Sequence, residues 1–152
     1  MSDDDVQAFW ERFLRSPAAQ LVRSPQRYGT MRIGLNSDAG AKLILDERKT
    51  ATSSHPSEYG TERPPFVGAL SIVVDGSDQP VAIVETIEVE LRKLKDLDDA
   101  FAEAYGEWDR TAETLKSELA TYYSAFGPSE GGDAAQGMEL LCERFRIIYS
   151  ER

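Results

Sequence analysis

Two runs of strand-forming residues, separated by a short turn sequence, constrain the fold more than any other feature of this chain. Residues 70–74 and 81–91 are rich in Val and Ile, which favour extended backbone. Between them, residues 75–78 read Asp-Gly-Ser-Asp, a composition typical of a hairpin turn. We therefore predict an antiparallel hairpin, and with it a fold that contains a β-sheet.

The second of these runs places one carboxylate on an aliphatic face. A strand repeats every two residues, so Glu85 shares its face with five aliphatic side chains. These are Val81, Ile83, Ile87, Val89 and Leu91. A carboxylate on such a face must pair, accept hydrogen bonds or shift its pKa. Two alternatives stay open: the opposite face of the strand is the inward one, or Glu85 lies at a bulge at the rim of a barrel.

A third strand, predicted over residues 139–149, repeats this pattern. The two-residue period groups Glu143 with Leu141, Phe145, Ile147 and Tyr149 on one face. Arg144 is its neighbour on the opposite face. Glu143 is therefore a second candidate for an inward carboxylate.

Four segments have the spacing or the capping residues of helices. Apolar residues in 3–15 recur at helical intervals and give this segment an aromatic face, which we interpret as core or a docking surface. Residues 36–38 (Asn-Ser-Asp) can cap a short helix that runs to about residue 47. Asp96 can cap a helix that ends near residue 105, and either Asp109 or Thr111 can cap the next, which Gly127-Pro128 would stop.

Three stretches between these elements are predicted to be irregular. Residues 16–34 contain two Ser-Pro pairs and are interpreted as an irregular wrap. Residues 53–65 contain prolines and a glycine and are interpreted as a surface loop. Residues 127–137 are rich in glycine and polar residues, and we expect a flexible connector there.

A cluster of basic and hydroxyl residues follows an apolar run that we expect to end a helix. Arg48, Lys49, Thr50 and Thr52 lie directly after residues 43–45 (Leu-Ile-Leu). An ammonium group beside hydroxyls suits a phosphate or a polar carbonyl. The alternative is an ordinary turn, because Thr and Ser are common after helices.

Charge and cysteine content exclude several classes of function. A net charge of −10 argues against non-specific coating of nucleic acid, so any RNA contact must be a local basic site. One cysteine, Cys142, forms no internal disulfide, and with His55 as the lone histidine there is no zinc set. We expect no metal and no cofactor. No apolar run is long enough to span a bilayer and the first residues are acidic, so we expect a cytoplasmic protein without membrane contact.

Several short motifs follow one another along the chain, and their order is more specific than any one of them. They are residues 49–52 (Lys-Thr-Ala-Thr), 65–68 (Pro-Phe-Val-Gly) before 71–73, 83–86 (Ile-Val-Glu-Thr), 106–110 (Gly-Glu-Trp-Asp-Arg) and 142–145 (Cys-Glu-Arg-Phe). This series resembles the ASCH domain family, relatives of the PUA fold. The resemblance implies an α+β fold with a PUA-like small β-barrel flanked by helices. Residues 1–29 would then form an N-terminal helix and wrap, and residues 30–150 the ASCH-like domain, within one globular unit.

The resemblance also implies a cleft that holds RNA or a modified nucleobase. Proteins of this family include ribonucleases and a bacterial amidohydrolase that removes the acetyl group of acetylcytidine. The amidohydrolase pattern is a lysine base, a threonine nucleophile three residues on, and a later glutamate. The first two match Lys49 and Thr52. The glutamate falls at Tyr105, so only Glu107 remains of the family's Glu-Gly-Glu form.

Other positions of the family pattern also differ in this chain. The places of a Trp-Arg pair and a histidine read Leu115, Lys116 and Leu119, and the usual glycine before the basic pair is Glu47. The polar wall that the family builds there is therefore largely apolar here.

Three hypotheses follow. The first is binding of short single-stranded RNA or of a nucleoside or nucleotide, including a ribonuclease acting on single-stranded RNA. Its ligand-binding candidates are Arg48, Lys49, Thr50, Thr52, Glu85, Tyr105, Glu143 and Arg144. The second is an amidohydrolase on an acetylcytidine-like nucleoside, with Lys49, Thr52 and Glu85 as catalytic candidates. The third is a regulatory or protein-interaction domain with a vestigial cleft. We expect a monomer or a homodimer.

Overall fold

The computed structural model describes residues 3–22, 25, 27–33, 36–125 and 137–151. These residues divide into two compact units. The first unit comprises residues 1–47, 66–87 and 145–152, and the second comprises residues 48–65 and 88–144. The predicted connector at residues 127–137 lies outside the described residues except for Gly137, as does the predicted helix stop at residues 127–128.

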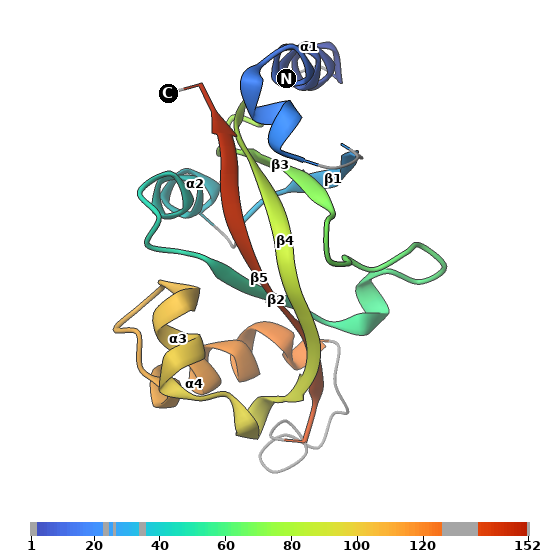
Figure 1. The fold of residues 1–152 in the computed structure, drawn as a ribbon. Coiled ribbons are helices and arrows are strands. Elements are labelled where there is room, and N and C mark those ends of the chain that lie inside the picture. The colour runs from blue at the N-terminus through green and yellow to red at the C-terminus, as the bar shows by residue number, and fades with distance from the viewer. Residues whose placement is uncertain (1–2, 23–24, 26, 34–35, 126–136, 152) are drawn as a thin grey trace. The chain divides into compact units, whose positions relative to one another are not determined.

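The described residues form a mixed α+β fold (Figure 1). The helices are α1 (Asp3–Leu14), α2 (Ser37–Leu45), α3 (Asp99–Tyr105) and α4 (Ala112–Tyr122). The strands are β1 (Arg27–Met31), β2 (Ala51–Ser54), β3 (Leu70–Val74), β4 (Pro80–Lys93) and β5 (Glu139–Ser150). Short 3-10 turns occur at Pro17–Leu21, Pro56–Glu58, Leu94–Asp96 and Tyr123–Ala125. The predicted α+β class is confirmed.

The strands belong to one five-stranded sheet in the order β1-β3-β4-β5-β2. β1 pairs parallel with β3, whereas the pairs β3–β4 and β2–β5 are antiparallel. Among the described strands, β1 and β2 are edges of this order, and the sheet is not closed. The predicted closed barrel is therefore not confirmed.

The predicted hairpin is present as β3 and β4. Its register pairs Leu70 with Glu85 and Ile72 with Ile83, with an irregularity beside Val74. In the connecting turn, one carboxylate oxygen of Asp75 accepts from the backbone N–H groups of Ser77 and Gln79. This side-chain capping explains why the aspartate-rich turn ends one strand and starts the next.

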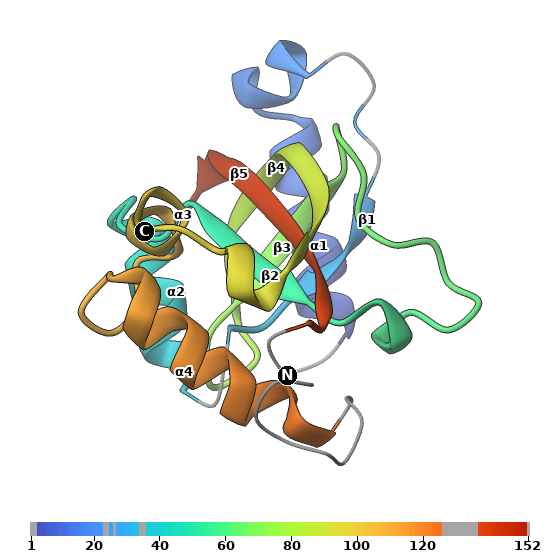
Figure 2. The ribbon, with the colours of Figure 1, turned by 90° about the horizontal axis from the view of Figure 1, so that it is seen from below.

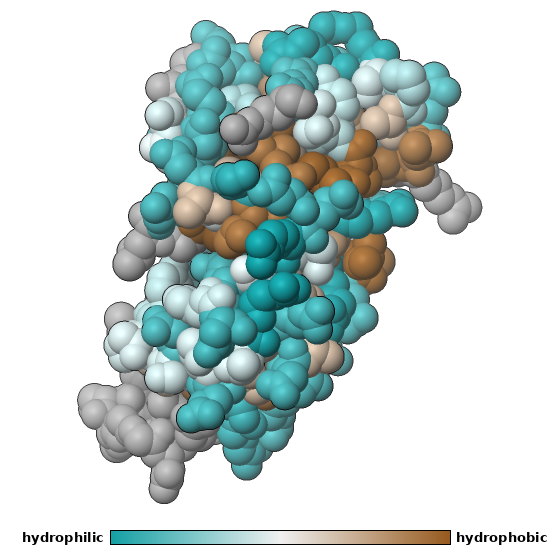
Figure 3. Space-filling model, turned by 90° about the vertical axis from the view of Figure 1, so that its left-hand side faces the viewer, coloured by the Kyte–Doolittle hydropathy of each residue, from teal (hydrophilic) through white to brown (hydrophobic). Residues whose placement is uncertain are grey.

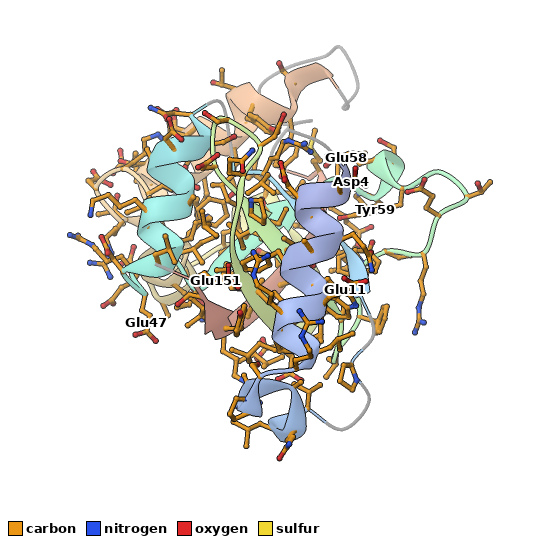
Figure 4. All side chains as sticks on the ribbon, turned by 90° about the horizontal axis from the view of Figure 1, so that it is seen from above. Asp4, Glu11, Glu47, Glu58, Tyr59 and Glu151 are labelled. Atoms are coloured by element: carbon orange, nitrogen blue, oxygen red, sulfur yellow. The ribbon has the colours of Figure 1, made fainter. Side chains whose placement is uncertain are left out.

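The aromatic face of α1 belongs to the core of the first unit. Phe9 and Phe13 are fully buried with Leu70, Ile72 and Ile83 of the hairpin. On the other side of the helix, carboxylates such as those labelled Asp4 and Glu11 in Figure 4 are exposed. The interpretation of this face as core is confirmed. A second cluster of the same unit packs Ala41 and Ile44 of α2 on Val73, Ala82, Val84 and Phe145.

Residues 27–31 form β1, so the prediction of an irregular wrap over residues 16–34 is wrong for this part. This strand has few strand-forming residues and contains Gly29. Its backbone pairs with β3, a partner about forty residues further along the chain. Because that pairing is long-range, the local composition does not signal it.

In the second unit, α3 and α4 contact each other and share a core with β2 and β5. Asp98 caps α3 by accepting from the N–H of Phe101, so the predicted cap Asp96 is wrong by two residues. Thr111 caps α4, as one of the two predicted alternatives has it. Leu115 and Leu119 are buried in this core. Figure 2 shows β2 beside β5.

The surface is mixed rather than uniformly polar. On the face drawn in Figure 3, apolar side chains gather in a brown band between hydrophilic areas. Within the described part of the chain, none of the helices combines the length and apolar character that crossing a membrane would need.

Candidate ligand-binding site

Lys49 is held by a close approach of two backbone segments in the second unit. The N–H of Thr50 donates to the carbonyl of Ala104, at 2.7 Å. Gly106 ends α3 with φ +75°, and a Cβ atom at this position would lie 2.3 Å from the carbonyl oxygen of Arg48. Only glycine fits both the left-handed backbone and this contact. The glycine therefore lets the end of α3 meet the segment that carries Lys49.

The segment after Lys49 is a strand, so the alternative of an ordinary turn is wrong, and the predicted loop over residues 53–65 is wrong for residues 53 and 54. Residues 51–54 form β2 and pair with β5, which places Thr52 opposite Glu143. Small polar residues are seldom typical of a strand, and β2 forms because its backbone pairs with β5. The pairing brings a hydroxyl and a carboxylate, ninety-odd residues apart in sequence, to neighbouring positions.

The side chain of Lys49 is completely buried, and its ammonium has three partners. Nζ lies 2.8 Å from Oε2 of Glu107 and donates to the carbonyl oxygen of Tyr105 at 3.0 Å. It also lies 3.5 Å from the centroid of the Tyr105 ring, the arrangement of a cation–π contact. The ammonium is therefore oriented by a carboxylate, a carbonyl and an aromatic face.

Burial lowers the pKa of Lys49 to about 8. Desolvation is the largest cause, since a buried ammonium loses its hydration. Glu107 and, more weakly, Glu143 act in the opposite direction by stabilising the charged form. At neutral pH most of the lysine is protonated, and a minor fraction is a neutral amine.

Glu85 has a partner of its own in the first unit. Its side chain is largely buried, and Oε1 accepts from Nε of Arg146 at 2.8 Å. The expectation that this carboxylate must pair is confirmed. The anions that act on the pKa of Lys49 are Glu107 and Glu143.

Glu143 is buried on β5, as its position on the strand predicted. Besides its effect on Lys49, it contributes to the raised pKa of Tyr59, whose main cause is desolvation. Tyr59, labelled in Figure 4, donates its hydroxyl to Oγ of Ser54 at 2.6 Å. The second unit thus contains, besides Lys49, the buried carboxylate of Glu143 and the hydrogen-bonded hydroxyls of Tyr59 and Ser54.

The hydroxyl groups of Tyr105, Ser53 and Tyr123 form a hydrogen-bonded chain. Oγ of Ser53 is 3.1 Å from the Tyr105 hydroxyl and 2.9 Å from the Tyr123 hydroxyl. The Thr52 side chain is a further hydrogen-bonding partner of Tyr105. Burial raises the pKa of both tyrosines, so both hydroxyls stay protonated at neutral pH. They therefore cannot act as bases at neutral pH.

The two arginine candidates lie nearer the surface. Arg48 is exposed. Arg144 is partly exposed, with its Nε 3.9 Å from Glu88 and its guanidinium over the Phe101 ring. Both are cations that an incoming anion can reach.

The second unit thus contains every ligand-binding candidate except Glu85. Sequence reasoning left out Glu107, Ser53 and Tyr123. Glu107 was visible as the remaining carboxylate of the Glu-Gly-Glu form, but its distance from Lys49 depends on the turn at Gly106. Within the described ranges, no group of three His, Cys, Asp or Glu side chains comes together to hold a metal ion.

These features define a class of small α+β domain with a buried lysine–glutamate pair where a strand meets the end of a helix. The family model for the ASCH domain matches residues 29–149, and the chain belongs to the ASCH domain family. The predicted resemblance is confirmed.

Two solved structures share this fold. The ASCH domain from Lactobacillus crispatus is 23% identical and superposes with a TM-score of 0.83, over 96% of this chain and 95% of that one. A protein from Enterococcus faecalis is 26% identical with a TM-score of 0.77, over 97% and 90% of the two chains. None of the curated proteins that were compared matches the chain.

Proposed function

We propose that the second unit binds a nucleotide or a short single-stranded RNA through the polar groups around Lys49. Membership of the ASCH domain family supports a ligand of this class. The observation that carries the proposal is the buried lysine held by Glu107, the carbonyl of Tyr105 and its ring. A lysine is almost never buried this completely unless it is paired, and buried ionisable groups with a shifted pKa are concentrated at functional sites.

The ligand would meet the groups of this set that solvent reaches. The Glu107 side chain is 23% exposed, and Arg48 and Arg144 present their charges at the surface. In this proposal Arg48 and Arg144 contact a phosphate. The buried charge of Lys49 adds to the positive electrostatic potential that attracts it. The net charge of −10 repels long polyanions, so a ligand with few phosphates is favoured.

The test is calorimetric titration of the protein with nucleotides and with a short oligoribonucleotide. We expect Arg48→Ala and Arg144→Ala to weaken binding, because each removes a surface cation. Lys49→Ala should weaken it as well, provided that circular dichroism shows an unchanged fold. Lys42→Ala is the matched control, since Lys42 is an exposed lysine that pairs with Asp46, four residues further along the chain. Unchanged binding in the first three variants would refute the proposal.

Hydrolysis is a second candidate, and the pKa of Lys49 favours it. A lysine with a pKa of about 8 is partly neutral near pH 7 and can accept a proton. In an amidohydrolase reaction, Lys49 would take the proton of the Thr52 hydroxyl while its oxygen attacks the acetyl carbonyl of an acetylcytidine. Lys49 would then return this proton to N4 of the cytidine as the carbon–nitrogen bond breaks, which releases the amine and leaves an acetyl ester on Thr52. Water would hydrolyse this ester to acetate and restore the Thr52 hydroxyl.

Incubation with acetylcytidine and with single-stranded RNA tests both hydrolytic activities. Product formation by the wild-type protein that disappears in Thr52→Ala supports the mechanism. Activity that survives in Thr52→Ala excludes this nucleophile, and no product from either substrate excludes the hydrolase and leaves binding.

A further inference from the structure

Trp108 is an exposed aromatic residue next to the candidate site. It directly follows Glu107, and 46% of its surface is exposed, whereas Trp10 is buried in the core of the first unit. A tryptophan gains most of its stabilising effect by burial. Because nearly half of the Trp108 surface stays exposed, the fold gains less stability from this side chain than it would from a buried tryptophan.

The backbone at Trp108 is unfavourable for a large side chain. Its φ of +56° lies in the left-handed region, where glycine is preferred and bulky residues are outliers. Arg110, two residues on, also has a positive φ. Strained backbone of this kind persists where the surrounding structure holds it, and it is concentrated at ligand sites. The turn therefore displays the indole at a conformational cost.

The orientation of the indole is fixed by Tyr105. The two rings are stacked, with centroids 6.1 Å apart and an interplanar angle of 14°. Tyr105 is itself held by the hydroxyl of Ser53 and by the ammonium of Lys49 against its ring. One aromatic residue of the site thus supports another that solvent reaches.

We propose that Trp108 is a stacking platform for a nucleobase. This inference rests on the proposed function and specifies which part of the ligand is bound where. A flat, oriented indole matches the face of any base, and stacking of this kind is how single-stranded nucleic acids are commonly held. The indole follows Glu107 in sequence and stacks on Tyr105, whose ring contacts the Lys49 ammonium. A base stacked on the indole would therefore lie close to these three residues.

The charges around the platform favour a base over a run of phosphates. The residues on either side of Trp108 are Glu107 and Asp109, and the nearby cation Arg110 is engaged with Glu103. Acidic neighbours repel phosphates but do not oppose stacking. Binding should therefore depend weakly on salt, in contrast to binding through many phosphate contacts.

The two tryptophans of the chain allow a direct test. Trp10→Phe leaves Trp108 as the one tryptophan, and Trp108→Phe leaves Trp10. We expect UMP, AMP and octauridylate to quench the emission of Trp10→Phe, because a stacked base quenches indole. Ribose 5-phosphate, which has no base, should leave it unchanged. The emission of Trp108→Phe should respond to none of them.

Affinity is measured separately by calorimetry in the wild-type background. Trp108→Asn removes the ring and keeps a residue that tolerates left-handed backbone. We expect a loss of about 5- to 150-fold in affinity, the range measured when one stacking residue is removed. Comparing UMP with octauridylate distinguishes a free nucleotide from RNA as the source of the base.

The results of these experiments test the stacking role of Trp108 and the proposed function separately. Calorimetric binding that is equal in the wild type and Trp108→Asn overturns the platform and leaves the function standing. Quenching by ribose 5-phosphate as strong as by UMP also overturns it, since the contact would not involve the base. Concentration-dependent emission with a dimer in light scattering would show that a second copy covers Trp108, and would overturn it too. No binding of any probe refutes the function as well.

Discussion

Nζ of Lys49 lies 2.8 Å from Oε2 of Glu107, although 57 residues of chain separate the two. The contact exists because Gly106 lets the end of α3 approach the backbone at Arg48 and Lys49. Desolvation lowers the pKa of this lysine to about 8, and the carboxylate keeps it from falling further. The lysine therefore changes its protonation state just above neutral pH.

Replacing the carboxylate should change the titration of the lysine. We expect Glu107→Gln to lower the pKa of Lys49 below about 8, since the largest contribution that favours the ammonium is lost. NMR titration of the lysine side chain, labelled with carbon-13, measures this pKa. Glu103→Gln is the control, because Glu103 is exposed and faces Arg110. A pKa that stays the same or rises in Glu107→Gln would contradict the assignment.

The buried lysine also makes stability depend on pH. Its pKa is about 8 in the folded chain and about 10.5 when unfolded, so between these values the unfolded chain binds more protons. The free energy of unfolding should then rise with pH, by about 1 kcal/mol from pH 7.5 to 9.

The measurement is urea unfolding of the wild type and of Lys49→Met at pH 7.5, 8.2 and 9. The difference between the two proteins isolates the lysine. From about pH 8 upward Cys142 has the opposite effect, because burial raises its pKa from 9.0 to about 12. Its thiol keeps its proton in the folded chain, so stability falls as the unfolded thiol ionises. Both proteins contain this thiol, so its effect cancels in their difference. Parallel pH profiles of the two proteins would exclude a titrating Lys49.

Gly106 should tolerate no side chain. Gly106→Ala would place a Cβ atom 2.3 Å from the carbonyl oxygen of Arg48, on a backbone with φ +75°. We expect it to lower the free energy of unfolding by about 2–4 kcal/mol, from left-handed strain and overpacking together. Gly60→Ala is the control, since φ is +53° there but nothing lies within 4 Å. Equal losses in the two variants would show that the close approach has no energetic role.

The hydroxyl of Ser53 should stabilise the second unit. Ser53→Ala leaves the Tyr105 and Tyr123 hydroxyls without the oxygen that lies between them. We expect a loss of about 1–3 kcal/mol, the net contribution of the two hydrogen bonds that the serine makes. Thermal and urea unfolding measure it, with Ser117→Ala on the exposed side of α4 as the control. A loss no greater than in the control would mean that water replaces the serine.

The elements predicted correctly are those whose signal is local. The hairpin of β3 and β4 follows from two β-branched runs and one turn, and α1 follows from the spacing of its aromatic residues. Thr111 could be named as a cap because its effect reaches only three residues along the chain. Such patterns are written within a window of a few residues, so the sequence displays them directly.

The elements that were missed depend on distant partners. β1 and β2 have weak strand composition and exist because β3 and β5 offer them hydrogen bonds. The position of the α3 cap was missed by two residues, since Asp96 and Asp98 are equally suitable as isolated residues. The closed barrel that the family resemblance implied is not formed by the described strands.

The sequence by itself determined the α+β class, the family and the presence of a basic-hydroxyl cluster at Lys49. Only the tertiary structure decided that Glu107 is the partner of this lysine, that Glu85 pairs with Arg146, and that Trp108 stays exposed on Tyr105. The reason is physical: periodicity and capping act over one or two turns of chain. Burial and charge pairing act through space between segments whose approach the sequence does not display.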